Sequence, residues 1–399
     1  MSPLVPARKQ WFILGRESLL AAAEIDAVLD LKKYNCIESI LKAETKEFDP
    51  GELIRQLGGT IKIALELGDN LSPMDTENKI IAELKTVSGK INFGISIYTN
   101  NRNDFFNIKL AEEFGKKIKK ALKAEGLSVR YVENREPILS SVTVEKNNLT
   151  GRGREFLIQK NTNNTFALAK TQAVQPFEEF SARDFGRPGR DDVSGMLPPK
   201  LAMMMINLSQ ANKNSTLLDP FCGSGTILSE AILLGYTNLV GTDISEKAIS
   251  DTRQNIDWIA SQFNIPTNNF RVKLQTEKVE HIDTVVPIAS INAIVAEPYM
   301  GKPLKGRETK EDLYTQAQEL KNLYLSAFSK FYRVLKPNGI AVFLIPRFRW
   351  QNEWITINCH KEIADLGFKT LPFLEEKMPL LYARPDQRVG REIWRFKKI

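Results

Sequence analysis

The stretch LLDPFCGSGTILSEA, residues 217–231, constrains the fold more than any other part of this 399-residue chain. An apolar segment ends at Asp219, a turn with Gly223 and Gly225 follows, and a helical pattern begins near Thr226. Glycines let a backbone pass close to a ligand, and the first turn of a helix presents free N–H groups. In open α/β sheets, ligands bind beyond the carboxyl ends of the strands. The stretch therefore predicts such a sheet, with a ligand site at its carboxyl edge.

Strand and helix patterns alternate along the whole second half of the chain. Strands that alternate with helices predict a mostly parallel sheet covered on both faces. We expect seven strands in this sheet and five helices whose apolar residues recur at helical spacing; no helix is expected between 270–275 and 291–297 or between the last two strands. The expected strands are 215–221, 238–244, 270–275, 291–297, 339–347, 368–376 and 391–399, and the expected helices are 200–209, 226–235, 247–263, 313–335 and 354–367.

The first 175 residues show the same alternation in shorter units. The clearest helix is predicted for 107–126, where Leu110, Phe114 and Ile118 share an apolar face and Gly126 ends the pattern. Apolar residues alternate along 91–99, which predicts a half-buried strand. Further strands are expected at 10–15, 60–67, 127–133, 140–146, 155–160 and 165–175, and further helices at 18–31 and 51–57.

Charge, cysteine content and hydropathy limit the kinds of binding partner and the cellular compartment that we expect for the protein. The formal net charge of +7 favours a polyanionic partner, because Lys and Arg side chains contact phosphates. The three cysteines and two histidines lie far apart, which argues against a zinc site, a disulfide framework or a Ser-His-Asp triad. No apolar run approaches the roughly 20 residues that cross a bilayer, and MSPLVPARKQWF lacks the core of a secretory signal. We therefore expect a cytoplasmic protein that binds no metal and no membrane.

Three interpretations compete for the glycine turn after Asp219. It can be purely structural, because a lone Gly-x-Gly is a weak signal. A dinucleotide fold requires Gly-x-Gly-x-x-Gly, but Leu228 stands at the third position, and there is no Gly-Lys-Ser/Thr for a P-loop. The third interpretation is S-adenosylmethionine, whose ammonium group can pair with Asp219. A second predicted strand ends at Asp243, whose carboxylate can accept both ribose hydroxyls, as in dinucleotide sites.

Four motifs together resemble the class I S-adenosylmethionine-dependent methyltransferases. They are DPFCGSGT, VGTDIS, the acid-Pro-aromatic stretch within VAEPYMG, and VLKPNGIAVF. The resemblance spans about 198–399 and implies a Rossmann-like methyltransferase domain with S-adenosyl-L-methionine as its methyl donor. By motif position it implies these cofactor contacts: Asp219, Phe221, Gly223 and Gly225 at the methionine end, Asp243 at the ribose, and Glu277 near the adenine.

The stretch VAEPYMG resembles the Asp/Asn-Pro-Pro-Tyr/Phe tetrad of methyltransferases that act on exocyclic amines. In that family the acid and the following carbonyl accept hydrogen bonds from the amine, and an aromatic ring stacks on the base. Such catalysis depends on positioning and electrostatics. The preferred alignment implies catalytic roles for Glu297, Pro298 and Tyr299, with Met300 in the aromatic place. An alternative alignment puts Tyr299 on the aromatic place and Ala296 on the acid; an inert acid after a buried strand is a further alternative.

The first half of the chain resembles the THUMP-containing RNA methyltransferases. The resemblance is carried by ILGRESLLAAAEI, LGGTIKIA, the lysine-rich helix and FGRPGRDDVSGMLPPKLA. The nearest group methylates the 2-amino group of a guanosine in tRNA. We therefore expect a ferredoxin-like α/β region over 1–90, a THUMP-like RNA-binding domain over 91–175, a linker over 176–199 and the methyltransferase domain over 200–399.

The expected partner is RNA, most of all tRNA; a small activating subunit is not implied by the sequence. An A-form helix is read by its shape and backbone, and the target base must leave its stack. Basic side chains are the candidate phosphate contacts, and a solvated surface is the alternative for each of them. On the predicted helix they are Lys116, Lys117, Lys119, Lys120 and Lys123, and in the linker Arg183, Arg187 and Arg190.

Two other functions stay open from the sequence. A DNA adenine-N6 or cytosine-N4 methyltransferase uses the same tetrad, although nothing in the chain indicates a DNA sequence-recognition domain. A non-catalytic RNA-binding protein on a methyltransferase scaffold would explain the unusual Glu297, but the intact donor motifs argue against it. The main hypothesis is a methyltransferase that acts on N2 of a guanosine in tRNA.

Overall fold

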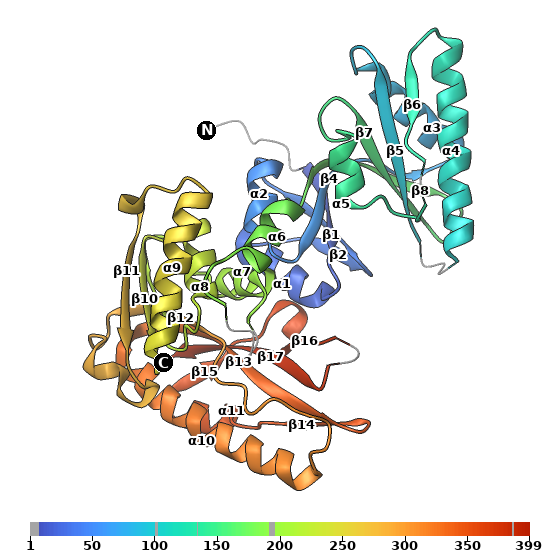
Figure 1. Cartoon of the computed structure of the whole chain (residues 1–399). Coiled ribbons are helices and arrows are strands. Elements are labelled where there is room, and N and C mark those ends of the chain that lie inside the picture. The colour runs from blue at the N-terminus through green and yellow to red at the C-terminus, as the bar shows by residue number, and fades with distance from the viewer. Residues whose placement is uncertain (1–7, 100–102, 134, 191–195, 385–386) are drawn as a thin grey trace, which may run out of the picture. The chain divides into compact units, whose positions relative to one another are not determined.

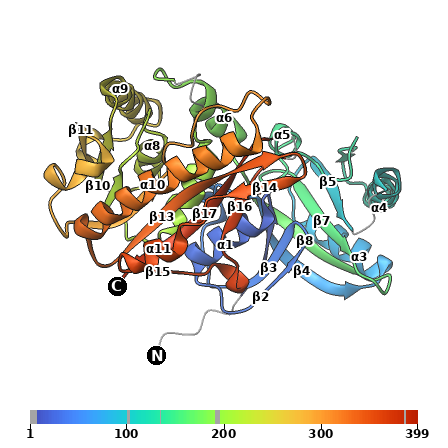
Figure 2. The same ribbon diagram turned by 90° about the horizontal axis from the view of Figure 1, so that it is seen from below.

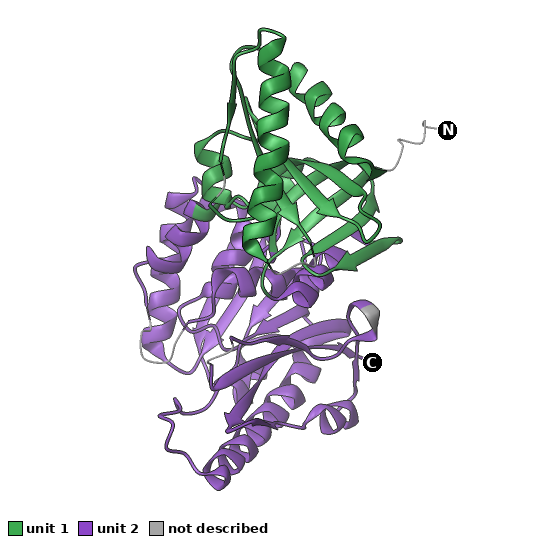
Figure 3. Ribbon diagram, turned by 90° about the vertical axis from the view of Figure 1, so that its right-hand side faces the viewer, with its two compact units in different colours: residues 1–16, 31–56, 60–177 green, residues 17–30, 57–59, 178–399 purple. Residues whose placement is uncertain are grey.

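A computed structural model describes residues 8–99, 103–133, 135–190, 196–384 and 387–399. The chain forms two compact units (Figure 3). Unit 1 comprises 1–16, 31–56 and 60–177, and unit 2 comprises 17–30, 57–59 and 178–399. The short segments 17–30 and 57–59 thus belong to unit 2 although they lie in the first half of the sequence. The linear boundaries expected at 90, 175 and 199 stay predictions.

Unit 2 is built on one sheet, which has nine strands among the described residues. Five consecutive strands of this sheet run parallel, and the last strand of the chain inserts antiparallel beside them. The order is β11 (Arg271–Thr276), β10 (Asn238–Asp243), β9 (Thr216–Asp219), β12 (Ile291–Ala296), β13 (Leu335–Trp350), β17 (Val389–Lys398) and β15 (Phe368–Thr370); β14 (Glu353–Thr356) pairs with β13 and β16 (Leu380–Tyr382) with β17.

Helices cover both faces of this sheet (Figures 1 and 2). Alternate strand residues point to opposite faces, so neighbours such as Val342 and Phe343 join different cores. The helices on one face are α7 (Pro199–Leu208), α8 (Thr226–Leu233) and α9 (Glu246–Gln262), and against them pack α1 (Ser18–Leu29) and α6 (Phe177–Phe185). The helices on the other face are η2 (Val279–Thr284), α10 (Lys310–Val334) and α11 (His360–Asp365). Two further short turns are η1 (Thr267–Asn269) and η3 (Leu374–Glu376).

A buried carboxylate joins α1 to the Gly-Gly turn within unit 2. Glu24 accepts hydrogen bonds from the backbone N–H groups of Gly58 and Gly59, both at 2.8 Å, and from the side chain of Asn207. Burial raises the pKa of Glu24 to about 7, although these hydrogen bonds lower it. An added Cβ at Gly59 would lie 2.6 Å from the Cβ of Ala21, so only glycine lets the turn approach α1 this closely.

Unit 1 is built on a second sheet, with eight strands among the described residues. α3 (Pro73–Lys85) and α4 (Asp104–Ala124) pack on its apolar strands, with Ile80, Phe114 and Ile118 in the core. The strand order is β2 (Tyr34–Ile37), β3 (Ile40–Thr45), β1 (Arg8–Leu14), β4 (Thr60–Leu71), β8 (Phe166–Val174), β7 (Arg154–Lys160), β5 (Ile91–Tyr98) and β6 (Val129–Tyr131); α2 (Pro50–Gln56) and α5 (Ser141–Lys146) complete the unit.

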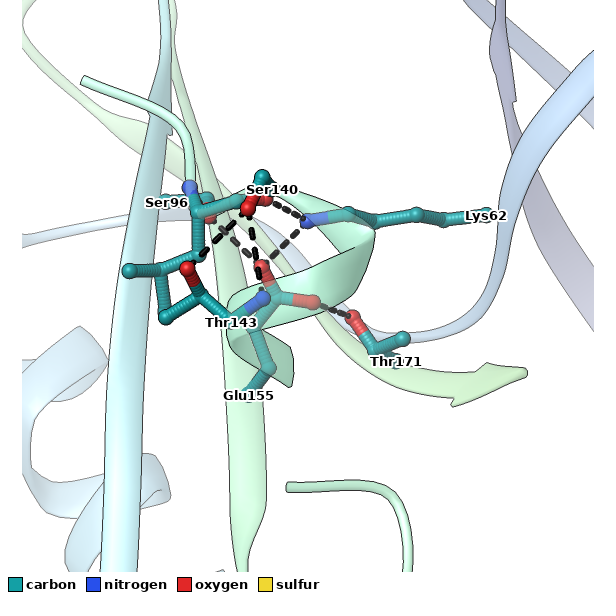
Figure 4. Close-up of polar contacts among 7 residues, drawn as sticks. Lys62, Ser96, Ser140, Thr143, Glu155 and Thr171 are labelled. Atoms are coloured by element: carbon teal, nitrogen blue, oxygen red, sulfur yellow. Dashed lines mark hydrogen bonds and ion pairs between the residues drawn. The ribbon is translucent and has the colours of Figure 1, made fainter. Parts of the chain in front are cut away.

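A buried ion pair lies in the middle of unit 1 (Figure 4). The ammonium group of Lys62 lies 2.5 Å from a carboxylate oxygen of Glu155, and both side chains are at most 1% exposed. Lys62 also donates to the carbonyl oxygen of Leu139, while Ser96 and Thr171 donate their hydroxyls to Glu155. These hydrogen bonds help offset the cost of removing two charges from water, which an ion pair alone does not always repay.

We expect Lys62→Met to destabilise unit 1 by about 3–5 kcal/mol, because it leaves the Glu155 carboxylate buried without its cation. Urea denaturation of the variant and of the wild-type chain measures the difference. The matched control is Lys85→Met, which removes a lysine from the exposed Lys85–Glu125 pair and should cost roughly 1 kcal/mol or less. Equal losses in the two variants would contradict the role of the buried pair.

The structure confirms most of the expected elements and corrects several. Residues 140–146, expected as a strand, form α5, because the Ser140 side chain caps the helix by accepting from Thr143 N–H. The expected helix 354–367 starts as β14, whose Trp354 pairs with Arg349 of β13. Strand β5 is buried on both faces rather than half-buried. The linker contains α6, and the sheet of unit 2 adds β14 and β16 to the seven strands of its main path.

Among the described residues, no helix combines the length and the apolar character needed to cross a membrane.

Candidate active site

Three carboxylates gather where adjacent parallel strands of unit 2 end. Asp219 ends β9, Asp243 ends β10, and Glu297 follows the last residue of β12. β9 pairs with both β10 and β12, so the carboxyl ends of all three strands lie at one edge of the sheet. This is the edge at which open α/β sheets bind ligands. The structure therefore brings together the acids expected to hold the donor and the acid expected to hold the acceptor.

The glycine loop between β9 and α8 is shaped by two left-handed residues. Gly223 has φ +50° and Gly225, at the N-cap of α8, has φ +81°. A Cβ added at Gly223 would meet nothing within 4 Å, so there is open space over this residue. Two side chains of α9 hold the loop: Thr252 donates to the carbonyl oxygen of Gly223 and Asn255 to that of Ser224, both at 2.7 Å. Neither residue could be found from the sequence, because both lie on a separate helix with no motif of their own.

We expect Gly225→Ala to weaken donor binding at least tenfold, because the new Cβ would lie 2.7 Å from Thr252 and displace the loop. Gly235→Ala is the matched control, because Gly235 has a similar φ of +85° but nothing within 4 Å of an added Cβ. Both variants pay a similar backbone cost, of about 1 kcal/mol. Calorimetric titration with S-adenosyl-L-methionine measures the donor affinity of each variant. Equal affinities in the two variants would contradict the claim that the shape of the glycine loop determines donor binding.

Asp219 is poised to bind a cation. Its side chain is buried. Among the described residues its carboxylate accepts one hydrogen bond, from the N–H of Phe221 at 3.2 Å. Burial raises the pKa of Asp219 well above its usual value, and the charges of Asp243 and Glu297 raise it further. A cationic group beside Asp219 would offset this repulsion, because opposite charge favours the ionised carboxylate. The ammonium and sulfonium groups of S-adenosylmethionine carry such charge, so the acids and the open space fit this donor.

Asp243 is oriented by two backbone N–H groups. Gly223 N–H donates to one carboxylate oxygen and Ser245 N–H to the other, both at 2.9 Å. Each oxygen keeps lone pairs for further donors, such as the two hydroxyls of a ribose. Glu277 lies beside it, because its N–H donates to the carbonyl oxygen of Asp243 at 2.9 Å. The adenine contact of Glu277 stays a prediction.

Glu297 makes an ion pair with Arg391. Nε of Arg391, on β17, donates to Oε1 of Glu297 at 2.8 Å, and the two side chains are only 17% and 15% exposed. The second carboxylate oxygen, Oε2, remains available to a substrate amine. Arg391 could not be found from the sequence, because it lies 94 residues from Glu297 and belongs to no local motif.

The turn after Glu297 is fixed by its neighbours. Buried Tyr324 donates its hydroxyl to the carbonyl oxygen of Tyr299 at 2.8 Å. Gly301 has φ +93°, and Gln316 accepts from the N–H of the next residue. Pro298 is buried, whereas the ring of Tyr299 is 54% exposed. A half-exposed ring next to the acid is free to stack on a base.

Two of the arginines expected to contact RNA are buried instead. Arg183 and Arg187 are each 5% exposed. Arg183 lies 3.5 Å from the buried carboxylate of Glu230 on α8, and Arg187 donates to the hydroxyl of Thr226 at the start of α8. Burial contradicts the expected phosphate contacts of these two arginines, because both side chains instead hold residues 178–190 against α8. Arg190 is half-exposed and donates to the carbonyl oxygen of Phe185, so its RNA contact stays a prediction.

The lysines of α4 lie on an exposed surface of unit 1. Lys116 pairs with Glu112 and Lys117 with Glu77, so acids already compensate two of these charges. Lys120 is exposed, as is Lys123. Their contacts with RNA stay predictions.

Comparison with known proteins agrees with this geometry. Residues 187–355 match the family described as RMKL-like, methyltransferase domain. Over 127 residues the chain is 38% identical to a tRNA (guanine(10)-N2)-dimethyltransferase of Methanothermobacter thermautotrophicus. This matched segment is 31% of this chain and 37% of that protein. Over 191 residues it is 29% identical to the protein of the same name from Methanocaldococcus jannaschii, covering 46% and 47%. The matches thus span less than half the length of these relatives.

The fold has a counterpart among solved structures. The crystal structure of TrmN from Thermus thermophilus aligns with a TM-score of 0.55 at 16% identity, over 98% of this chain and 100% of that one. This likeness supports the fold expected from the sequence. Residues 187–355 are therefore similar to the RMKL-like methyltransferase domains, and the three acids at the sheet edge fit S-adenosyl-L-methionine as the methyl donor.

Proposed function

We propose that the protein methylates N2 of a guanosine in tRNA. The observation that carries this proposal is the position of Glu297, which lies at the same sheet edge as Asp219 and Asp243 and keeps one carboxylate oxygen for a substrate amine. The tRNA guanine-N2 activity named for the two archaeal relatives supports the choice of substrate.

In the proposed reaction, Glu297 and the carbonyl oxygen of Pro298 accept hydrogen bonds from the 2-amino group. These contacts direct the amine lone pair at the methyl carbon of the bound donor. Met300 takes the aromatic place of the preferred alignment, so the exposed ring of the preceding Tyr299 stacks on the base in its stead. The donor would supply the methyl group to the amine nitrogen and leave with the electron pair on its sulfur, and Glu297 would pass one amine proton to water. Asp219 and Asp243 hold the donor so that most of the rate comes from positioning.

The remaining parts of the chain complete the proposal. Unit 1 acts as a THUMP-like RNA-binding module in which Lys116, Lys120 and their neighbours contact phosphates, and Arg190 lies on the route of the RNA. The target base leaves its stack to reach Tyr299. The protein works in the cytoplasm, and it needs neither a metal nor a membrane.

Transfer of label from methyl-labelled S-adenosyl-L-methionine tests this function. We expect label in bulk tRNA and none in duplex DNA, and mass analysis of the nucleosides should find N2-methylated or N2,N2-dimethylated guanosine. Label only in DNA would favour an adenine-N6 or cytosine-N4 activity. Donor binding without transfer to any nucleic acid would favour a non-catalytic RNA-binding protein.

A further inference from the structure

The loop that follows the Glu297 turn is strongly basic and uncompensated. Lys302, Lys305 and Arg307 are exposed, and within the described part of the chain their side chains make no ion pair or hydrogen bond. The lysines Lys116 and Lys117 on α4, in contrast, have acidic partners. Cations without acidic partners on a surface are the usual contacts of phosphates.

A groove of about 400 Å³ lies between this loop, the first turns of α10 and the far end of β13. Leu304 and Leu313 give it an apolar side, and Trp350 an aromatic one. Arg349 and Arg388 add two exposed guanidinium groups. Apolar, aromatic and cationic groups in one groove match the faces and the phosphates of nucleotides, because bases stack on aromatic rings and on guanidinium planes.

The loop lies against the side chain of Arg388. The two carboxylate oxygens of Glu308 accept from the N–H groups of Lys305 and Gly306, at 2.5 and 2.7 Å. Gly306 has φ +87°, and a Cβ there would lie 1.5 Å from Nη1 of Arg388. The guanidinium group of Arg388 therefore lies directly on the Gly306 backbone. Among the described residues that line the groove, Glu308 is the one acid, and both of its carboxylate oxygens accept from this backbone.

The groove lies at a distance from Glu297, at the far end of β13. Phe343 of β13 pairs with Ala296, the residue before Glu297, and β13 then runs seven residues further, to Trp350. Seven residues of strand span roughly 23 Å. Arg391, the partner of Glu297, pairs with β13 at Pro346, between the two ends of this path. The groove is thus too far from Glu297 to hold the target base itself.

We propose that this loop and groove bind the single-stranded RNA that adjoins the target guanosine, with phosphates on Lys302, Lys305 and Arg307 and a neighbouring base between Arg388 and Trp350. This inference rests on the proposed function and deepens it. It assigns to the methyltransferase domain its own RNA-binding site, separate from unit 1. Such a site holds the strand after the target base has left its stack.

The double variant Lys302→Ala/Lys305→Ala tests the site. We expect its KM for tRNA to rise roughly tenfold at 0.15 M salt, with kcat and donor affinity nearly unchanged, because phosphate contacts add binding energy equally before and during reaction. The slope of log affinity against log salt for a single-stranded guanosine-containing RNA should fall by about 1.4, or about 0.7 for each lost contact. Arg388→Ala should raise the same KM.

Lys361→Ala/Lys369→Ala is the matched control, since these two exposed lysines, on α11 and β15, also have no ion-pair partner in the described structure. β15 pairs with the end of β17 that lies near Ile340, at the amino end of β13, away from the groove. An unchanged KM and salt slope in the Lys302/Lys305 variant, or equal losses in the control, would overturn the site. If the wild-type protein methylates no tRNA, the proposed function fails. The RNA-binding site can still be tested in that case, by comparing the affinity of the two double variants for the oligonucleotide.

Discussion

Glu297→Ala should lower the turnover number by about 10³-fold or more while the protein still binds S-adenosyl-L-methionine. Without the carboxylate, the amine has lost the acceptor that directs its lone pair, and a pre-organised contact of this kind contributes about 10²–10³ in rate. The acid also removes the proton, which contributes a further factor. Single-turnover transfer of labelled methyl to tRNA gives the rate, and calorimetry gives the donor affinity.

Two neighbours determine what else this variant changes. Arg391 loses its partner, but it is 17% exposed and can be hydrated, so the protein should still fold. The pKa of Asp219 should fall, because the Glu297 charge is one of the groups that raise it. This favours ionised Asp219 and keeps the donor bound.

Glu297→Asp is the conservative control for the extra methylene. It should retain part of the activity, because a carboxylate remains at the end of β12, although it reaches Arg391 less well. Normal turnover in Glu297→Ala would refute the assigned alignment.

Asp243→Ala should weaken donor binding by roughly 10²–10⁴-fold, with a smaller effect on the rate at saturating donor. The variant removes the acceptor for two ribose hydroxyls, and hydrogen bonds to a charged group contribute about 1.5–3 kcal/mol each. It also removes the acceptor of the Gly223 N–H, so the glycine loop loses one of its supports. Calorimetric titration measures the affinity.

Glu246→Ala is the matched control for charge, because Glu246 is an exposed acid in the first turn of α9, three residues after Asp243. It removes one negative charge close to the site but no hydrogen-bond acceptor of the donor. We expect its donor affinity to stay within about twofold of the wild-type value, since exposed charges are well screened. The ribose assignment would fail if both variants bound the donor equally well.

Local sequence patterns predicted the place of a candidate site residue wherever one short stretch contains both that residue and the strand or helix that carries it. The strand, turn and helix of residues 217–231 appear as β9, the glycine loop and α8, with Asp219 at the expected place. The same holds for Asp243 and Glu297, each at the end of an apolar strand. Patterns failed where two elements compete for the same residues: SSVTVEK alternates like a strand, but Ser140 caps it as a helix.

The sequence by itself determined the α/β fold of unit 2 and the places of Asp219, Asp243 and Glu297 at the ends of its strands, because strand and helix periods and the positions of glycines act over a few residues. Only the tertiary structure decided that Arg391 pairs with Glu297, that Arg183 and Arg187 are buried, and that α1 belongs to unit 2. These contacts join residues far apart in the chain. Their energy depends on burial and on the partner that the fold supplies, and neither is written in a local pattern.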